Sequence, residues 1–258
     1  MLSLLEAAKP YTEYFSGIRL STRPDYIDDE ILVLLKKYSV KTIELGAQSM
    51  NDEVLAANSR GHSSEDVVKS SELIKSYGFK LGLQMMTGLF MSDAEKDIGT
   101  ARRFISIRPD CVRIYPTVIM RGTDLFRYYS EGLYTPYSLE ESVELVSKLL
   151  LMFYDEKIDV IRVGLHYSDS LAENDVARNY HPAFKELCEN RIFFNKMIQK
   201  LQFVDNKEID IIVNPSSLSK AIGQKRSNLL YLEKNGYNIH YIKDPSLDKY
   251  DIVVKEHR

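Results

Sequence analysis

Apolar runs that end in polar or glycine residues recur along residues 16–165, and segments with helical spacing separate them. Apolar runs of this length predict strands, whereas apolar residues that recur every three or four positions predict helices. We expect strands at residues 16–22, 41–46, 79–86, 110–116 and 159–165. We expect helices at residues 1–14, 28–38, 52–57, 63–77, 93–107 and 139–156. Such alternation is typical of parallel βαβ units.

The predicted fold class is therefore α/β, with a partial (β/α) barrel over residues 1–167. The strands up to residue 116 give four βα units, and a closed barrel of this type has eight. A polar loop at residues 168–179 reads as a domain boundary. Beyond it, a helix at 183–201, a strand at 208–213, a helical hairpin around Gly223 and a strand at 237–242 predict a smaller α+β region over residues 168–258.

The composition and the net charge limit the classes of protein to which this chain can belong. The chain has 258 residues, of which 44% are hydrophobic and 28% charged, so it can bury a large core. The net charge of −3 argues against a surface that coats nucleic acid throughout, although a local basic patch remains compatible with it. The sequence shows neither a secretion signal nor an apolar run of membrane-spanning length. We therefore expect a cytoplasmic protein with no membrane partner.

Polar residues follow the second and third predicted strands. Gln48 comes just past the second strand in LGAQS, and Arg60 lies between two predicted helices in NSRGH. Gln84 and Gly88 belong to LQMMTGL in and after the third strand. An amide at a strand end offers two donors and an acceptor, which suits a ribose, and a guanidinium suits a carboxylate. The alternatives are that Gln48 caps the following helix and that Arg60 is simply solvated.

These segments carry a resemblance to a known family. VKTIELGAQSMNDEVLAANSRG (40–61) and FKLGLQMMTGLF (79–90), with STRPD (21–25) and RIYPT (113–117), resemble radical S-adenosylmethionine (radical SAM) enzymes. The branch that looks closest holds the catalytic subunit of Elongator and the oxygen-independent coproporphyrinogen dehydrogenases. The amide of Gln84 is typical of the Elongator-like branch, whereas the coproporphyrinogen enzymes have an acidic residue there.

The resemblance implies roles for residues at one end of the barrel. Gln48 would contact the ribose of S-adenosylmethionine (SAM), Arg60 would hold its methionyl carboxylate, and Tyr115 would lie near the adenine or the substrate. The full set of residues expected to bind this cofactor is Gln48, Arg60, Gln84, Gly88, Arg113 and Tyr115. No catalytic residue is assigned, and no metal ligand is expected in this chain.

The three-cysteine motif that defines the family is absent. The chain has only Cys111 and Cys188, far apart in the sequence, and a [4Fe-4S] cluster is held by several cysteine thiolates. The resemblance therefore implies that about two N-terminal units of a six-unit core, with the cluster ligands, are missing, and that the chain as given is inactive alone. The family's reaction is reductive cleavage of SAM by the cluster to a 5′-deoxyadenosyl radical, with a reductant protein such as ferredoxin or flavodoxin.

Four arginines lie on or beside predicted strands: Arg19, Arg23, Arg113 and Arg162. A charge in a strand that is covered on both faces is costly unless it is paired. Such residues should therefore point into a polar barrel lumen, which could hold anions. The alternative is a buried set of ion pairs with Glu44 and its neighbours.

The segment LSKAIGQKRSNL at residues 218–229 resembles the core of a KH RNA-binding module, whose GXXG loop clamps a nucleotide backbone. Gly223 matches the first glycine, and Arg226 replaces the second. The residues expected to bind RNA are Lys220, Gly223, Lys225 and Arg226. The alternative is an ordinary helical hairpin with a solvated basic turn.

The first function hypothesis is a radical SAM enzyme with tRNA as a candidate substrate. The alternatives are a catalytically inactive module that binds SAM or RNA, and a coproporphyrinogen-type oxidoreductase. A barrel enzyme unrelated to radicals would need an acid–base pair, and no convincing His/Asp or paired-carboxylate arrangement stands out in the sequence.

Overall fold

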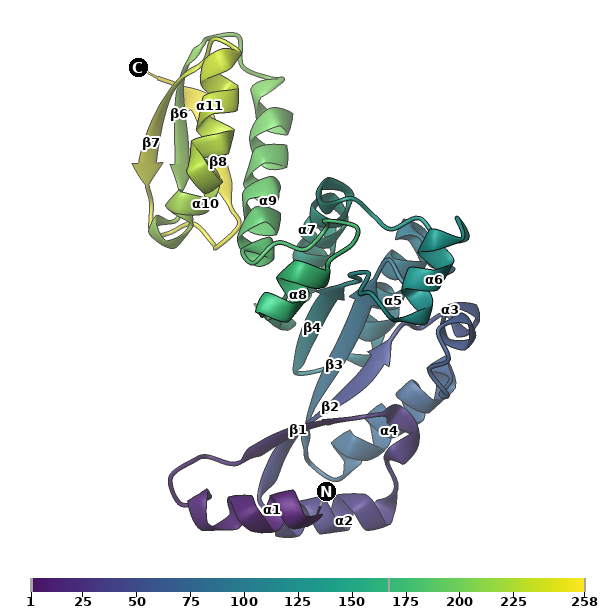
Figure 1. Cartoon of the computed structure of the whole chain (residues 1–258). Helices are drawn as coiled ribbons and strands as arrows, with labels where there is room; N and C mark the ends of the chain where they lie inside the picture. The colour runs from purple at the N-terminus through teal and green to yellow at the C-terminus, as the bar shows by residue number, and fades with distance from the viewer. Residues whose placement is uncertain (1, 167, 258) are drawn as a thin grey trace. The chain divides into compact units, whose positions relative to one another are not determined.

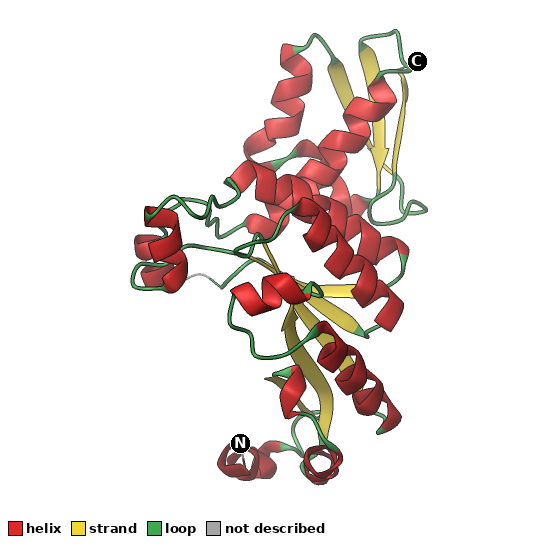
Figure 2. Ribbon diagram, turned by 90° about the vertical axis from the view of Figure 1, so that its right-hand side faces the viewer, coloured by secondary structure: helices red, strands yellow, loops and turns green. Residues whose placement is uncertain are grey.

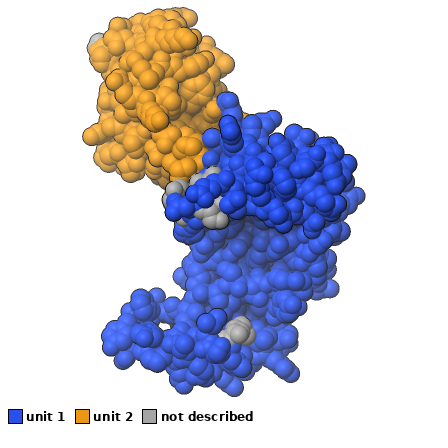
Figure 3. All heavy atoms as spheres, viewed as in Figure 1, with its two compact units in different colours: residues 1–142, 152–180 blue, residues 143–151, 181–258 orange. Residues whose placement is uncertain are grey.

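A computed structural model describes residues 2–166 and 168–257. The chain forms two compact units, residues 1–142 with 152–180 and residues 143–151 with 181–258 (Figure 3). The predicted domain boundary at 167/168 and the predicted end at 258 involve residues 167 and 258, which lie outside the described part. That division remains a prediction.

The first unit is built on a parallel sheet of five strands in the order β1-β2-β3-β4-β5 (Figure 1). Each strand pairs in parallel with the next one along the chain, as expected of successive βα units. The predicted α/β class and the parallel sheet are confirmed. The strands are β1 (Ile18–Thr22), β2 (Val40–Gln48), β3 (Lys80–Thr87), β4 (Cys111–Pro116) and β5 (Asp159–Val163).

Helices connect these strands and pack on one face of the sheet. Helices α2 and α4 pack against β2, and α4 and α5 pack against β3 (Figure 2). Ile43 and Leu45 on β2 and Leu83 on β3 are fully buried, because apolar side chains of alternate residues face these helices. The helices of residues 2–174 are α1 (Leu2–Ala8), α2 (Asp29–Lys37), α3 (Asp52–Ala57), α4 (Ser64–Ser76), α5 (Ala94–Ile107), α6 (Asp124–Ser130), α7 (Leu139–Asp155) and α8 (Asp169–Asn174). Residues 143–151 of α7 belong to the second unit.

Short polar side chains fix where the helices begin. Asp28 accepts a hydrogen bond from the backbone N–H of Ile31 and caps α2. Ser63 and Asp66 form a capping box at the start of α4. These caps place the helices within one or two residues of the ranges predicted from the sequence, so the βα units enter their helices as expected.

The second unit contains a three-stranded mixed sheet in the order β7-β6-β8, in which β6 is parallel to β7 and antiparallel to β8. Ile209, Ile211 and Val213 of β6 are fully buried on one face. The predicted smaller α+β region is confirmed, but β8 was missed by the sequence prediction. The elements are α9 (Phe184–Leu201), β6 (Glu208–Val213), α10 (Leu218–Ile222), α11 (Ser227–Lys234), β7 (Asn238–Lys243) and β8 (Ile252–Glu256).

The turn that follows β3 is held by a buried carboxylate. Asp97 of α5 is 1% exposed and accepts hydrogen bonds from the backbone N–H of Gly88 at 2.8 Å and the hydroxyl of Ser92 at 2.7 Å. Burial raises the pKa of Asp97 to about 6, although the hydrogen bonds from Ser92 and Gly88 oppose the rise. Asp97 thus fixes the strand-to-helix turn at the carboxyl end of β3.

Asp97→Asn should change how stability depends on pH. Folded Asp97 keeps its proton up to about pH 6, and its reference pKa is 3.8, so wild-type stability falls through this site as pH rises from about 4 to 6. Asparagine does not titrate in this range, so the Asp97→Asn variant does not lose stability through this site. The free energy of unfolding of the variant minus that of wild type should rise by about 2–3 kcal/mol between pH 4 and pH 7. Urea unfolding across this range measures it, and a pH-independent difference would contradict the assignment.

Candidate functional site

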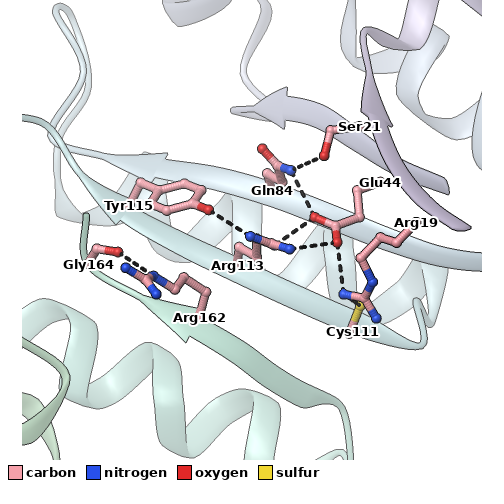
Figure 4. A network of polar contacts seen from close by, with 9 residues as sticks. All are labelled: Arg19, Ser21, Glu44, Gln84, Cys111, Arg113, Tyr115, Arg162 and Gly164. Carbon is pink, nitrogen blue, oxygen red and sulfur yellow. Dashed lines mark hydrogen bonds and ion pairs between the residues drawn. The ribbon is translucent and has the colours of Figure 1, made fainter. Parts of the chain in front are cut away.

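A buried carboxylate organises the polar face of the five-stranded sheet. Glu44 of β2 is 1% exposed. Its Oε1 lies 2.8 Å from Nη1 of Arg19 and 2.9 Å from Nη2 of Arg113, and its Oε2 lies 2.7 Å from Nε of Arg113 (Figure 4). Gln84 donates through Nε2 to Oε2 of Glu44 and to the hydroxyl of Ser21, both at 2.9 Å. Strands β1 to β4 are therefore tied together across this face.

Two glycines make room for these side chains. Gly82 of β3 is in register with Glu44, and a Cβ at Gly82 would lie 2.6 Å from Cγ of Glu44. A Cβ at Gly46 would lie 2.9 Å from Nε2 of Gln48. The side chains of Glu44 and Gln48 thus occupy space that only glycine leaves open on this sheet.

The four arginines on or beside the strands make different contacts. Arg19 and Arg113 share Glu44, so the predicted alternative of an ion-pair set with Glu44 accounts for these two. Arg23 pairs with Asp25 at 2.7 Å, just after β1. Arg162 donates from Nε to the backbone carbonyl of Gly164 at 3.2 Å. Partial burial lowers the pKa of Arg113, but hydrogen bonds to Tyr115 and Glu44 outweigh it and leave the pKa above its ordinary value.

Gln48 is the last residue of β2, although the sequence predicted that the strand ends before it. Its φ is +65°, so the backbone turns there in a left-handed conformation. The side chain is 9% exposed, and its Oε1 is buried with no hydrogen-bond partner in the described chain. The helix-cap alternative is wrong, because Asn51 caps α3 by accepting from the N–H of Val54. The side-chain amide of Gln48 therefore lies at the end of β2, and its Oε1 is available to accept a hydrogen bond from a ligand.

Arg60 lies in the loop between α3 and α4, as predicted. His62 binds the carbonyl of Ala47 at 3.1 Å, and the carbonyl of Gly61 accepts from Arg23 at 3.4 Å, so the loop is fastened to the carboxyl ends of β1 and β2. The Nε of Arg60 is buried and has no hydrogen-bond partner among the described residues. Burial and the charge of Arg23 lower the pKa of Arg60. A half-buried cation beside a second cation favours an anionic ligand.

Gln84 and Gly88 are already committed to structural contacts. Gln84 holds Glu44 and Ser21, as described above. Gly88 has a φ of +71°, and a Cβ there would lie 2.8 Å from the ring of Tyr137, so a tight turn against a tyrosine explains this glycine. Tyr115 accepts from Nη1 of Arg113 at 3.3 Å on the polar face. The cofactor roles of these residues stay predictions.

The sequence analysis missed a group of buried polar atoms after β3 and β4. Each has no hydrogen-bond partner in the described part of the chain: Oγ1 of Thr87, Oγ1 of Thr117, the hydroxyl of Tyr137 and Oδ1 of Asn179. Asn179 also donates to the backbone carbonyls of Thr117 and Tyr137, each at 3.1 Å. Ordinary threonines and tyrosines give no sequence signal of this kind. Unpartnered buried polar atoms cost free energy, and a bound polar group would satisfy them.

In the second unit, the turn between α10 and α11 presents two cations. Gly223, Lys225 and Arg226 have φ of +87°, +51° and +62°, and a Cβ at Gly223 would lie 2.8 Å from the backbone nitrogen of Asn228. Lys225 and Arg226 are exposed. Arg226 lies 3.7 Å from the exposed carboxylate of Glu233, and Lys220 lies 3.4 Å from the buried carboxylate of Glu189. Arg226 therefore has the left-handed backbone typical of the glycine that it replaces.

Comparisons with known proteins place this architecture in a family. The profile of the radical SAM superfamily matches residues 4–100, and the profile of the Radical_SAM C-terminal domain matches residues 109–193. Together they cover more than two thirds of the chain. This chain belongs to the radical SAM superfamily.

Radical SAM relatives include proteins of the Elongator type. The chain is 34% identical over 131 residues to the tRNA uridine(34) acetyltransferase of Methanocaldococcus jannaschii, covering 50% of this chain and 24% of that protein. It is 36% identical over 139 residues to Elongator complex protein 3 of Homo sapiens, covering 53% of this chain and 25% of that protein. The chain thus matches only about a quarter of the length of these relatives.

A solved structure agrees with these relatives. The archaeal Methanocaldococcus infernus Elp3 with an N-terminal deletion superposes with a TM-score of 0.62 and 27% identity, covering 76% of this chain and 45% of that one. The suspected Elongator-like resemblance is therefore confirmed at the level of family and fold. No helix in residues 2–166 or 168–257 is long and apolar enough to span a membrane.

The cysteines of this radical SAM chain do not fit an iron–sulfur cluster. Cys111 and Cys188 are both buried, and burial raises the pKa of each thiol, which disfavours the thiolate that binds iron. Among the described residues no group of three or more His, Cys, Asp or Glu side chains could hold a metal ion. We therefore assign no cluster ligand to either cysteine.

Glu44→Gln should destabilise the chain by about 2–3 kcal/mol, because it leaves Arg113 without its buried counter-charge while water still screens the partly exposed Arg19. In a double-mutant cycle with Arg113→Gln, the two substitutions should cost less together than their sum, by about 1–3 kcal/mol. Denaturant unfolding measures both quantities. Arg127→Gln is the matched control, since Arg127 and its partners Asp124 and Glu131 are exposed and their loss should change stability little. Strict additivity of Glu44→Gln and Arg113→Gln would contradict the network.

Proposed function

We propose that this chain forms the SAM-binding part of a radical SAM enzyme of the Elongator-like branch that acts on RNA. The observation that supports it most is the half-buried guanidinium of Arg60, whose Nε has no partner in the described chain and whose pKa is lowered by burial and by the charge of Arg23. Gln48 offers an unpartnered amide oxygen at the end of β2, to which the loop of Arg60 is fastened. These polar groups are complementary to a ligand with a carboxylate and hydroxyl groups.

In this proposal Gln48 binds the ribose hydroxyls and Arg60 binds the methionyl carboxylate of SAM. Gln84, Arg113 and Tyr115 complete the polar surface around the ligand, and Gly88 allows the tight turn of the backbone after β3. SAM, when bound together with an iron–sulfur cluster, supplies the radical chemistry of the superfamily, whereas the protein supplies binding and orientation. The cluster and a reductant such as ferredoxin or flavodoxin are required for turnover, so on its own the chain binds SAM without catalysis.

Arg60→Ala should weaken SAM binding by about 2–3 kcal/mol, the range of a hydrogen bond to a charged group. Isothermal titration calorimetry of the 258-residue chain measures the affinity. The ligand control is 5′-methylthioadenosine, which lacks the methionyl carboxylate, so its affinity should not change in Arg60→Ala. The protein control is Arg102→Ala, an exposed arginine of α5.

If Arg60→Ala bound SAM as tightly as wild type, Arg60 would be a solvated surface residue that does not hold the carboxylate of SAM. Equal losses for SAM and 5′-methylthioadenosine would show that Arg60 acts on the fold of the loop rather than on the carboxylate. Absence of any SAM binding by the wild-type chain would overturn the proposed function itself.

The RNA part of the proposal comes from the second unit and from the relatives. One relative is named a tRNA uridine(34) acetyltransferase. The turn from Gly223 to Arg226 exposes Lys225 and Arg226 in left-handed conformations that hold both side chains at the tip of a helical hairpin. We place RNA phosphates at this turn, with Gly223 allowing close approach of the backbone. Lys220, which is paired with Glu189, contributes through the long-range field of its charge.

Lys225→Gly and Arg226→Gly should each weaken binding of single-stranded RNA without unfolding the turn, because glycine is favoured at positive φ. Affinity should fall with salt with a log–log slope of about −0.7 for each phosphate contacted, and each variant should make the slope shallower. Fluorescence anisotropy with a labelled oligonucleotide at several salt concentrations measures this. Lys234→Ala, at an exposed position in the last turn of α11, is the control. If neither Lys225→Gly nor Arg226→Gly changed the affinity for RNA, the segment would be an ordinary helical hairpin that does not bind RNA.

A further inference from the structure

The polar face of the five-stranded sheet carries more positive than negative charge. The network of Figure 4 contains three guanidinium groups, those of Arg19, Arg113 and Arg162, and one carboxylate, that of Glu44. Glu44 contacts Arg19 and Arg113 and does not contact Arg162. Two positive charges in this network are therefore unbalanced by any side chain within it.

Arg162 carries part of this excess charge and has no acidic partner among the described residues. It contributes Nε to the carbonyl of Gly164 at 3.2 Å, and no carboxylate of the described residues lies within ion-pair distance of its guanidinium. Arg162 is in register with Arg113 on the neighbouring strand. Like charges in directly opposite positions on adjacent strands are destabilising. A bound anion would remove this repulsion.

Tyr115 provides a second donor on the same polar face as Arg162. Its hydroxyl oxygen accepts a hydrogen bond from Nη1 of Arg113 at 3.3 Å. Because that oxygen is already an acceptor, its own hydrogen remains available to donate to another group. Figure 4 shows Tyr115, Arg113 and Arg162 on the same face of β4 and β5. The side chain of Arg162 is half-buried, so a ligand there would be partly shielded from water.

We infer that Arg162 and Tyr115 bind a phosphoryl group of the substrate on the polar face of the sheet, with Arg113 as the adjacent positive charge. A carboxylate or an internal phosphodiester would neutralise only one of the two unbalanced charges, whereas a terminal phosphomonoester or diphosphate neutralises both. The guanidinium fork of Arg162 also matches two phosphoryl oxygens at once. As a site for a substrate group this inference rests on the proposed function, whereas binding of the anion itself does not.

The test is calorimetric titration of the full chain with pyrophosphate, inorganic phosphate and acetate at constant ionic strength. Pyrophosphate and phosphate should bind, and acetate should bind much more weakly. Arg162→Gln should reduce pyrophosphate affinity by about tenfold or more, as expected for loss of a charge-assisted contact. Tyr115→Phe should reduce it by a few-fold, and Arg162→Lys should restore part of the affinity lost in Arg162→Gln. Arg102→Gln is the matched control and should change nothing.

A second measurement keeps the test independent of how the variants fold. In wild-type protein with ¹⁵N-labelled arginine, pyrophosphate should shift the Nε–Hε signal of Arg162 and leave that of Arg102 in place. Absence of binding by wild type, equal affinity for acetate, or full affinity in Arg162→Gln would each overturn the inference.

The test of the phosphoryl site can succeed or fail independently of the test of SAM binding. Arg162→Gln should bind SAM as wild type does, and Arg60→Ala should bind pyrophosphate as wild type does. If the wild-type chain binds pyrophosphate through Arg162 but does not bind SAM, the proposed function fails and the phosphoryl site stands. Loss of both affinities in Arg162→Gln would assign this face to SAM and would overturn a separate phosphoryl site.

Discussion

The carboxylate of Glu44 is the interaction on which the polar face of the sheet depends. A buried carboxylate needs partners from several directions, and here they come from β1, β3 and β4: Arg19, Gln84 and Arg113. The space for it comes from Gly82, one strand away, where any larger residue would collide with Cγ of Glu44. The chain therefore keeps one face of its parallel sheet polar, while the other face packs on helices in the usual apolar way.

A face organised in this way separates charges with different functions. The guanidinium groups that touch Glu44 are fixed in place by it and stabilise the sheet, although one carboxylate offsets only one of their two charges. Arg60 and Arg162 lack such a counter-charge among the described residues. They lie at different places, Arg60 in the loop fastened to the ends of β1 and β2 and Arg162 on β5. This difference supports two ligand groups, a carboxylate at the first and a phosphoryl group at the second.

The sequence predicted the parallel sheet well because each strand is a compact apolar run followed by a capped helix. It missed α6 and α8, which are short helices inside polar loops, and it missed β8, whose residues Ile252–Glu256 alternate weakly and end in charges. It also ended the second strand at residue 46 and placed Gln48 just past it, whereas β2 ends at Gln48. A glutamine in a left-handed conformation leaves no periodic signal, and only the fold shows that its amide packs over Gly46.

The site was harder to predict than the fold for a specific physical reason. Strand periodicity shows that Arg19, Arg113 and Arg162 lie on a sheet, but which of them reaches Glu44 depends on register, and a register shift between Val112 and Arg113 decides it for β4 and β5. That shift sets Arg162 opposite Arg113, whereas an unbroken register would set Arg162 opposite Ile114. Ion pairing and ligand binding by the same residue type are therefore distinguished by strand alignment, a property of pairs of distant segments that no single stretch of sequence contains.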